Sequence, residues 1–166
     1  MLYLDHAATS PVRPEVRAAM EPYLTAVFGN AASHHTAGET AARALEDART
    51  RVARVFGARV GDVVFTGGGT EANNLAVKGI TLAALASGRR RVVVSPIEHE
   101  SIRESAAYLA RFHGVTVAMP AVDGTGRIGP DALDTVLTDD TAVVSVGHAN
   151  NEIGTVQDIA ALREVV

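Results

Sequence analysis

Short runs of β-branched residues alternate with amphipathic stretches along this chain, and the alternation restricts the folds that the chain can adopt. The β-branched runs lie at residues 63–65, 92–94, 115–117 and 142–146. A stretch of helical character follows each run, beginning near residues 70, 101, 130 and 158. Strands that alternate with helices in this way predict an α/β fold with a mostly parallel sheet and helices on both faces.

Residues 39–56 form the clearest predicted helix. Apolar residues recur there at helical spacing between Ala41 and Val55, and arginines and Asp47 occupy the positions between them. Such a pattern is typical of a helix that packs one face against a core. Gly57 follows directly and predicts the end of the helix, because glycine readily adopts the left-handed conformation found there.

Two further helix boundaries can be read from the sequence. Ser101 and Glu104 have the spacing of a capping box, so we expect them to open the helix after residues 92–94. We expect a short helix over residues 130–137. The helix expected from residue 158 stays apolar up to Val166 and has no capping residue. We therefore expect the chain to be cut off at Val166 rather than finished there.

Composition and charge exclude several classes of protein. The 166 residues are 47% hydrophobic and 20% charged, which favours one globular domain over residues 1–166 rather than a disordered chain. A formal charge of −4 argues against direct binding to nucleic acid. No apolar run approaches the roughly 20 residues that span a bilayer, so no membrane contact is expected. The N-terminus lacks the pattern of a secretory signal, which favours the cytoplasm.

Two residue types limit the chemistry that this chain can perform. The chain contains no cysteine, so it offers neither a disulfide nor a thiolate nucleophile. Lys78 is its only lysine, whereas it has fourteen arginines. The six histidines show no metal-ligand spacing, and no metal site is predicted.

The most informative loop follows residues 63–65 and reads TGGGTEANN, residues 66–74. Glycines that lead into a helix N-terminus present backbone N–H groups to an anion, and Thr70 adds a hydroxyl group. The loop is not a Walker A motif, since no Lys-Ser/Thr pair follows the glycines. Gly67, Gly69 and Ala72 also satisfy the G-x-G-x-x-A pattern of a dinucleotide-binding loop. Such a loop needs an acidic residue about 20 residues further on to bind the ribose, and the first acid after the next strand, Glu98, lies beyond that distance. A tight turn without a ligand is the third interpretation.

Two more polar loops follow predicted strands. Residues 95–100 read SPIEHE, and His99 could stack on a planar cofactor or transfer protons, although a surface histidine is the simpler interpretation. Residues 147–155 read GHANNEIGT; their paired asparagines could donate to a ligand oxygen or simply build a turn. Ligands of open α/β sheets bind beyond the carboxyl ends of strands, so the three loops together predict a site at one edge.

With these motifs in view, the chain resembles the NifS/IscS cysteine desulfurases. Residues 4–11 (LDHAATSP), 30–38 (NAASHHTAG), 66–74, 98–99 and 148–154 (HANNEIG) are similar to motifs of that family and follow its order. Alanine stands at position 31 where the family usually has proline. The stretch NNEIG favours this branch over the related SufS-type enzymes.

The resemblance implies the fold, the cofactor and the roles of several residues. It implies part of the large domain of a type I aminotransferase fold, which binds pyridoxal 5'-phosphate (PLP). Gly69 and Thr70 would hold the cofactor phosphate, His99 would stack on its ring and act in catalysis, and Asn151 would bind its phenolic oxygen. Asn30, Ser33 and His35 would shape the substrate side, without an assigned role.

The resemblance also implies a reaction and its partners. Family members remove sulfur from L-cysteine, leave alanine and an enzyme persulfide, and supply a sulfur-acceptor protein such as an iron–sulfur scaffold, or tRNA thiolation. They are usually homodimers. Their Schiff-base lysine, pyridine-pairing aspartate and persulfide cysteine lie downstream of the last residue here. Lys78 is eight residues beyond Thr70, about 12 Å along a helix, and is expected to be a solvated helix lysine instead.

We therefore expect an incomplete cysteine desulfurase that is inactive alone. Two alternatives stay open. One is a non-catalytic binding or regulatory fragment that acts on another desulfurase chain. The other is a different PLP enzyme of the same fold type, such as an aminotransferase.

Overall fold

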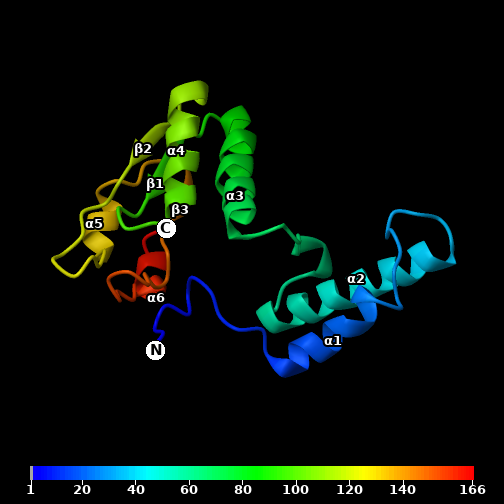
Figure 1. Cartoon of the computed structure of the whole chain (residues 1–166). Coiled ribbons are helices and arrows are strands. Elements are labelled where there is room, and N and C mark those ends of the chain that lie inside the picture. The colour runs from blue at the N-terminus through cyan, green and yellow to red at the C-terminus, as the bar shows by residue number, and fades with distance from the viewer. Residues whose placement is uncertain (1) are drawn as a thin grey trace. The chain divides into compact units, whose positions relative to one another are not determined.

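The computed structural model describes residues 2–166, which form two compact units (Figure 1). The first unit ends at Phe65 and the second begins at Thr66. Each unit has its own elements and is described separately below. Among the described residues, no helix combines the length and the apolar composition that crossing a membrane requires.

The first unit consists of helices α1 (Pro14–Leu24) and α2 (Thr36–Phe56) and a short 3₁₀ turn, η1 (Val60–Asp62). Helix α2 confirms the predicted helix, and Gly57 ends it with a φ of 62°. The expected core packing is wrong for most of its apolar stripe, because Leu45, Ala48 and Val55 are exposed. Within residues 2–65 the stripe has no sheet to pack against.

The predicted strand at residues 63–65 is not a strand in the structure. A strand requires a partner, and the carbonyl oxygen of Val63 accepts instead from the Arg49 guanidinium. That guanidinium also lies over the Phe65 ring, 5.2 Å from its centroid. The segment is extended but pairs with a side chain, which explains why β-branched composition alone misled the prediction.

The second unit contains a three-stranded parallel sheet in the order β2-β1-β3. Its strands are β1 (Arg91–Val94), β2 (Thr116–Ala118) and β3 (Thr141–Ser145). Val92 pairs with Val117 on one side of β1 and with Val143 on the other. Three of the four predicted strands and their parallel arrangement are therefore confirmed.

Helices cover both faces of this sheet, as predicted. Helices α3 (Gly69–Ala84) and α4 (Glu100–His113) lie side by side in Figure 1, and the short turn η2 (Leu85–Ser87) follows α3. Helices α5 (Pro130–Asp134) and α6 (Ile159–Arg163) pack against the opposite face. Both are shorter than predicted.

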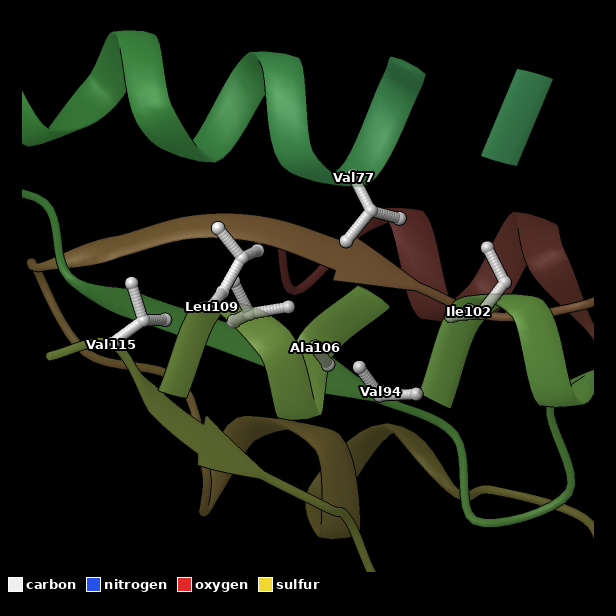
Figure 2. Close-up of a cluster of buried hydrophobic side chains, with 7 residues drawn as sticks. Val77, Val94, Ile102, Ala106, Leu109 and Val115 are labelled. Carbon is white, nitrogen blue, oxygen red and sulfur yellow. The ribbon is translucent and has the colours of Figure 1, made fainter. Parts of the chain in front are cut away.

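The alternation of side chains along β1 builds two cores. Val92 and Val94 face the cluster under α3 and α4, where Leu109 is fully buried (Figure 2). Val93 points the other way and packs with Leu133 and Leu162 beneath α5 and α6. Burial on both faces explains why this strand reads as an unbroken valine run.

The expected capping box at Ser101 and Glu104 is wrong. Helix α4 begins at Glu100, and its N-cap is His99, two residues before the expected N-cap Ser101. The Nδ1 atom of His99 accepts from the backbone N–H of Ser101 at 3.1 Å. A histidine ring therefore replaces the expected serine hydroxyl in satisfying a helix-end donor.

Candidate functional site

A cavity of about 490 Å³ lies where the loops after β1 and β3 meet. Its lining includes Glu98, His99 and Arg103 from the first loop and α4, and Asn150 and Asn151 from the second loop. This volume lies within the range of small-molecule sites. The structure thus brings His99 and Asn151, two of the predicted site residues, into one cavity at the predicted edge of the sheet.

His99 is held by its own helix. Its exposed imidazole turns Nδ1 toward Ser101, and the Ser101 hydroxyl lies 2.8 Å from the same nitrogen. The backbone N–H of Ser101 donates to that nitrogen as well. These two contacts fix the orientation of the ring at the cavity.

Glu98 is anchored between the two loops. Its Oε1 accepts from the hydroxyl of Ser145, the last residue of β3, at 2.8 Å. Its Oε2 accepts from the backbone N–H of His99 at 3.3 Å. The same oxygen would lie only 3.3 Å from a Cβ at Gly147, so the loop passes close to this carboxylate. Glu98 therefore ties the start of α4 to the end of β3.

Asn150 forms the second tie between the loops. Its Nδ2 donates to the carbonyl oxygen of Ile97 at 2.9 Å. Its Oδ1 accepts from the backbone N–H groups of Glu152 and Ile153, at 2.9 and 3.0 Å. The first asparagine of the pair thus builds the turn, and the turn presents Asn151 at the cavity.

The glycine-rich loop opens α3, as the sequence predicted. Gly69 and Thr70 are its first two residues, and Gly68 is an extended N-cap with a φ of 168°. The carboxylate of Glu71 folds back and accepts from the backbone N–H of Gly67 at 2.7 Å. The carbonyl oxygen of Gly68 accepts the first helical bond, from Ala72, so earlier N–H groups lack intrahelical acceptors.

This donor set fits a phosphate group. Backbone N–H groups at a helix start and the Thr70 hydroxyl are all donors, and the helix dipole favours negative charge there. A Cβ built on Gly68 or Gly69 would meet nothing within 4 Å, so open space lies beside both. A phosphate oxygen could therefore approach this backbone closely.

Gly69 and Thr70 do not line the cavity, but a side chain connects their helix to it. Asn73, the fifth residue of α3, donates from Nδ2 to the Ser101 hydroxyl at 2.8 Å. Since Ser101 contacts the His99 ring, two hydrogen bonds link the start of α3 to the cavity. The cofactor roles predicted for Gly69, Thr70, His99 and Asn151 stay predictions.

Lys78 lies within the continuous helix α3, as expected. Its ammonium group sits over the Tyr108 ring of α4, with Nζ 4.4 Å from the ring centroid. The side chain is half-buried, so the description of a solvated lysine needs correction: it is a cation–π contact between two helices.

The motif at residues 30–38 belongs to the first unit, where it forms a tight turn and the start of α2. The His35 Nδ1 accepts from the backbone N–H of Gly38 at 3.2 Å, and Asn30 Oδ1 accepts from Ala32 at 2.9 Å. A Cβ at Gly38 would lie 2.2 Å from the Ser33 carbonyl oxygen, so only glycine fits. These contacts give Asn30 and His35 local structural roles.

Sequence reasoning did not predict the hydrogen bonds that join separate segments at the site through four residues: Asn73, Glu98, Ser101 and Asn150. Each makes a hydrogen bond described above, and three of these bonds join segments far apart in the sequence. The position of Glu98 and Asn150 at strand ends was the available signal. No local signal could pair Asn73 with Ser101, which lies 28 residues away.

Other candidate sites are weaker. A cavity of about 790 Å³ in the first unit lies between α1 and α2 and is lined mainly by apolar residues. Its Asp47 and Arg51 pair with each other at 2.8 Å. Among residues 2–166, no cluster of three or more histidine, aspartate or glutamate side chains could hold a metal ion.

Comparison with known proteins decides the family. Residues 2–166 match the family described as Aminotransferase class-V. The chain belongs to this family. Among class-V relatives, the cysteine desulfurase IscS of Dictyoglomus turgidum is 40% identical over 164 residues, which are 99% of this chain and 41% of that protein. The IscS-like cysteine desulfurase of Mycobacterium tuberculosis is 43% identical over 169 residues, 99% of this chain and 43% of that protein.

Solved structures agree with this membership. A NifS-like protein superimposes with a TM-score of 0.92 at 32% identity, over 99% of this chain and 45% of that one. The structure of SspA in complex with cysteine gives 0.89 at 32% identity, over 99% and 47%. The resemblance to NifS/IscS proteins and the aminotransferase-type α/β fold are confirmed. The chain spans about two fifths of the curated relatives.

Proposed function

We propose that this class-V chain is the N-terminal part, residues 1–166, of the PLP-binding domain of a cysteine desulfurase. The observation that carries the proposal is that His99 and Asn151 line one cavity. Hydrogen bonds through Ser101 and Asn73 link that cavity to α3, whose first residues have the donors that fit a phosphate group. The relatives named cysteine desulfurases support the reaction type. Aminotransferases of class V and cysteine desulfurases are PLP-dependent enzymes, which supports the cofactor.

Each site residue has a proposed part in holding the cofactor. The backbone N–H of Gly69 and the hydroxyl of Thr70 donate to the phosphate. His99 stacks its imidazole on the pyridine ring, and Asn151 donates from its amide to the phenolic oxygen. PLP, when bound, supplies an electron sink for carbanion chemistry at an amino acid. Hydrogen bonds from Asn150 and to Glu98 hold the two loops beside each other.

The proposed substrate is L-cysteine, and the proposed products are alanine and a sulfur atom carried as a persulfide. The solved relative SspA in complex with cysteine supports a cysteine substrate. The persulfide requires a thiolate, and this chain has no cysteine, so that group comes from elsewhere in the complete protein. A sulfur-acceptor protein such as an iron–sulfur scaffold, a homodimeric assembly and a cytoplasmic location complete the proposal.

A product assay on the full-length protein tests this function. L-cysteine and PLP should yield alanine and, with a reductant, sulfide in equal amounts. His99→Ala should lower kcat by about tenfold or more, because the ring contact and its hydrogen bonds are lost. His113→Ala is the matched control, since it removes an imidazole from the opposite end of the same helix.

Three outcomes would contradict the proposal. Transfer of an amino group to a 2-oxo acid, without sulfide, would identify an aminotransferase. Binding to another desulfurase chain without any turnover would identify a regulatory module. Wild-type turnover by His99→Ala would contradict the proposed role of His99 at the cofactor.

A further inference from the structure

Three side chains from two helices form a continuous hydrogen-bonded chain that ends on His99. Asn73 of α3 donates from Nδ2 to the Ser101 hydroxyl at 2.8 Å, and that hydroxyl lies 2.8 Å from the Nδ1 of His99. Ser101 is buried in the first turn of α4, and the Ser105 hydroxyl donates to its carbonyl oxygen at 2.7 Å. The middle member of the chain is therefore fixed on both its backbone and its side chain.

The direction of these hydrogen bonds determines which ring nitrogen carries the hydrogen. A backbone N–H can only donate, and that of Ser101 points at Nδ1 from 3.1 Å. Nδ1 must therefore offer a lone pair, so the neutral ring carries its hydrogen on Nε2. With Nδ1 unprotonated, the Ser101 hydroxyl is the donor of the 2.8 Å contact, and it shares the single lone pair of Nδ1 with the backbone N–H.

Asn73 supports that direction. Its amide N–H occupies an acceptor site of the Ser101 oxygen, and the serine hydrogen then turns to Nδ1. An acceptor at position 73 would compete for the same hydrogen. All hydrogen bonds in this series therefore point in one direction, from the Asn73 amide through the Ser101 hydroxyl to the imidazole.

We propose that Asn73 and Ser101 are positioning residues that hold His99 as the Nε2–H tautomer. His99 then presents a hydrogen-bond donor, and no lone pair, to a ligand in the cavity. The matching ligand atom is an acceptor, such as an anionic oxygen or a thiolate sulfur. Only the identity of that ligand rests on the proposed function; the tautomer follows from contacts within this chain.

Nitrogen NMR of the full-length protein labelled with ¹⁵N-histidine tests the tautomer without substrate. Spectra are recorded at a pH of about 9, where imidazole is neutral, and the His99 signals are identified by their absence in His99→Gln. In the wild type, Nδ1 should resonate as an unprotonated nitrogen and Nε2 as a protonated one. A protonated Nδ1 in the wild type would overturn the proposal.

Two variants test the positioning residues. Ser101→Ala removes the hydroxyl donor, and Asn73→Asp replaces the donor with an acceptor, so both should move the two ¹⁵N shifts toward each other. Ser101→Thr retains the hydroxyl and should restore the wild-type shifts. Ser87→Ala, which removes an exposed hydroxyl bonded to the Ala84 carbonyl oxygen, should leave them unchanged. Wild-type shifts in folded Ser101→Ala and Asn73→Asp would refute the positioning role.

The kinetic readout separates this proposal from the function itself. If the full-length protein releases sulfide, Ser101→Ala should lower kcat about fivefold with little change in KM, as expected for one weakened hydrogen bond at the reacting centre. A protein that makes no sulfide can still give the predicted ¹⁵N shifts. In that case the proposed function fails while the tautomer assignment holds.

Discussion

Thr70 carries the side-chain donor that we expect to bind the cofactor phosphate at the start of α3. Thr70→Val keeps the shape of the side chain and removes its hydroxyl group, while the backbone N–H groups remain. A hydrogen bond to a charged group contributes about 1.5–3 kcal/mol, so PLP should bind the full-length protein about tenfold more weakly or worse. Equilibrium titration with PLP measures this change.

Thr135→Val is the control for that substitution. Thr135 is exposed at the end of α5, and its hydroxyl donates to the Ala132 carbonyl oxygen at 2.8 Å. This variant should bind PLP with wild-type affinity. Equal affinities for wild type and Thr70→Val would contradict the phosphate role of the hydroxyl.

At the scale of single residues, sequence reasoning found what strand ends present but not how the residues connect. His99 and Asn151 follow predicted strands, and the cavity contains both. The role of Asn150 in the turn could also be expected from its side-chain type. The Asn73–Ser101 contact depends on how α3 packs against α4, and no spacing along one helix reports it.

At the scale of elements, β-branched runs were predicted correctly as strands where the fold provides a neighbouring strand to pair with. Residues 92–94 and 63–65 have nearly the same β-branched composition. The first segment lies between two parallel partners and is buried, whereas Val64 is 63% exposed and has no partner strand within the described residues. β-propensity describes a fit to a half-buried pleated surface, so it cannot decide whether such a surface exists.

The turn at residues 123–127 is an element with a predictable response to acid. Asp123 Oδ1 accepts from the Thr125 hydroxyl at 2.6 Å and from the backbone N–H groups of Thr125 and Arg127 at 2.8 and 3.0 Å. The Thr125 hydroxyl, followed by the Arg127 N–H, lowers the pKa of this carboxyl. Gln157 Nε2 in turn donates to the Gly126 carbonyl oxygen at 2.8 Å, so the turn supports the segment after the cavity loop.

Asp123→Asn tests this turn. Because the folded-state pKa lies below the unfolded value, the carboxylate stabilises the fold above the unfolded pKa. That contribution is lost as the pH falls through the folded-state pKa. The variant should therefore have a lower Tm than the wild type at neutral pH, and the difference should shrink as the pH falls below the ordinary pKa of an aspartate. Thermal unfolding at several pH values measures it.

Asp139→Asn provides the comparison, since it changes an exposed aspartate outside the turn. It should not reproduce the pH-dependent difference. A constant gap between Asp123→Asn and wild type at all pH values would contradict the proposed origin of the stabilisation.

At the scale of the whole molecule, the alternation of strands and helices was sufficient to predict a parallel sheet covered on both faces. It could not predict the order β2-β1-β3, because several orders satisfy the same alternation. Nor could it predict the division at Phe65, since residues 2–65 contain a long amphipathic helix that suggested core packing. That division depends on contacts between segments, which periodicity does not report.

The composition of the 166 residues limits the chemistry that the isolated chain can perform. The chain has no thiol and one lysine, and that lysine rests on the Tyr108 ring. A persulfide requires a cysteine thiolate, so the purified 166-residue chain should release no sulfide from L-cysteine and PLP. The full-length protein, assayed in parallel with the same reductant, should release it. Sulfide release by the isolated chain, free of other desulfurases, would contradict the proposal that the persulfide thiolate comes from outside these 166 residues.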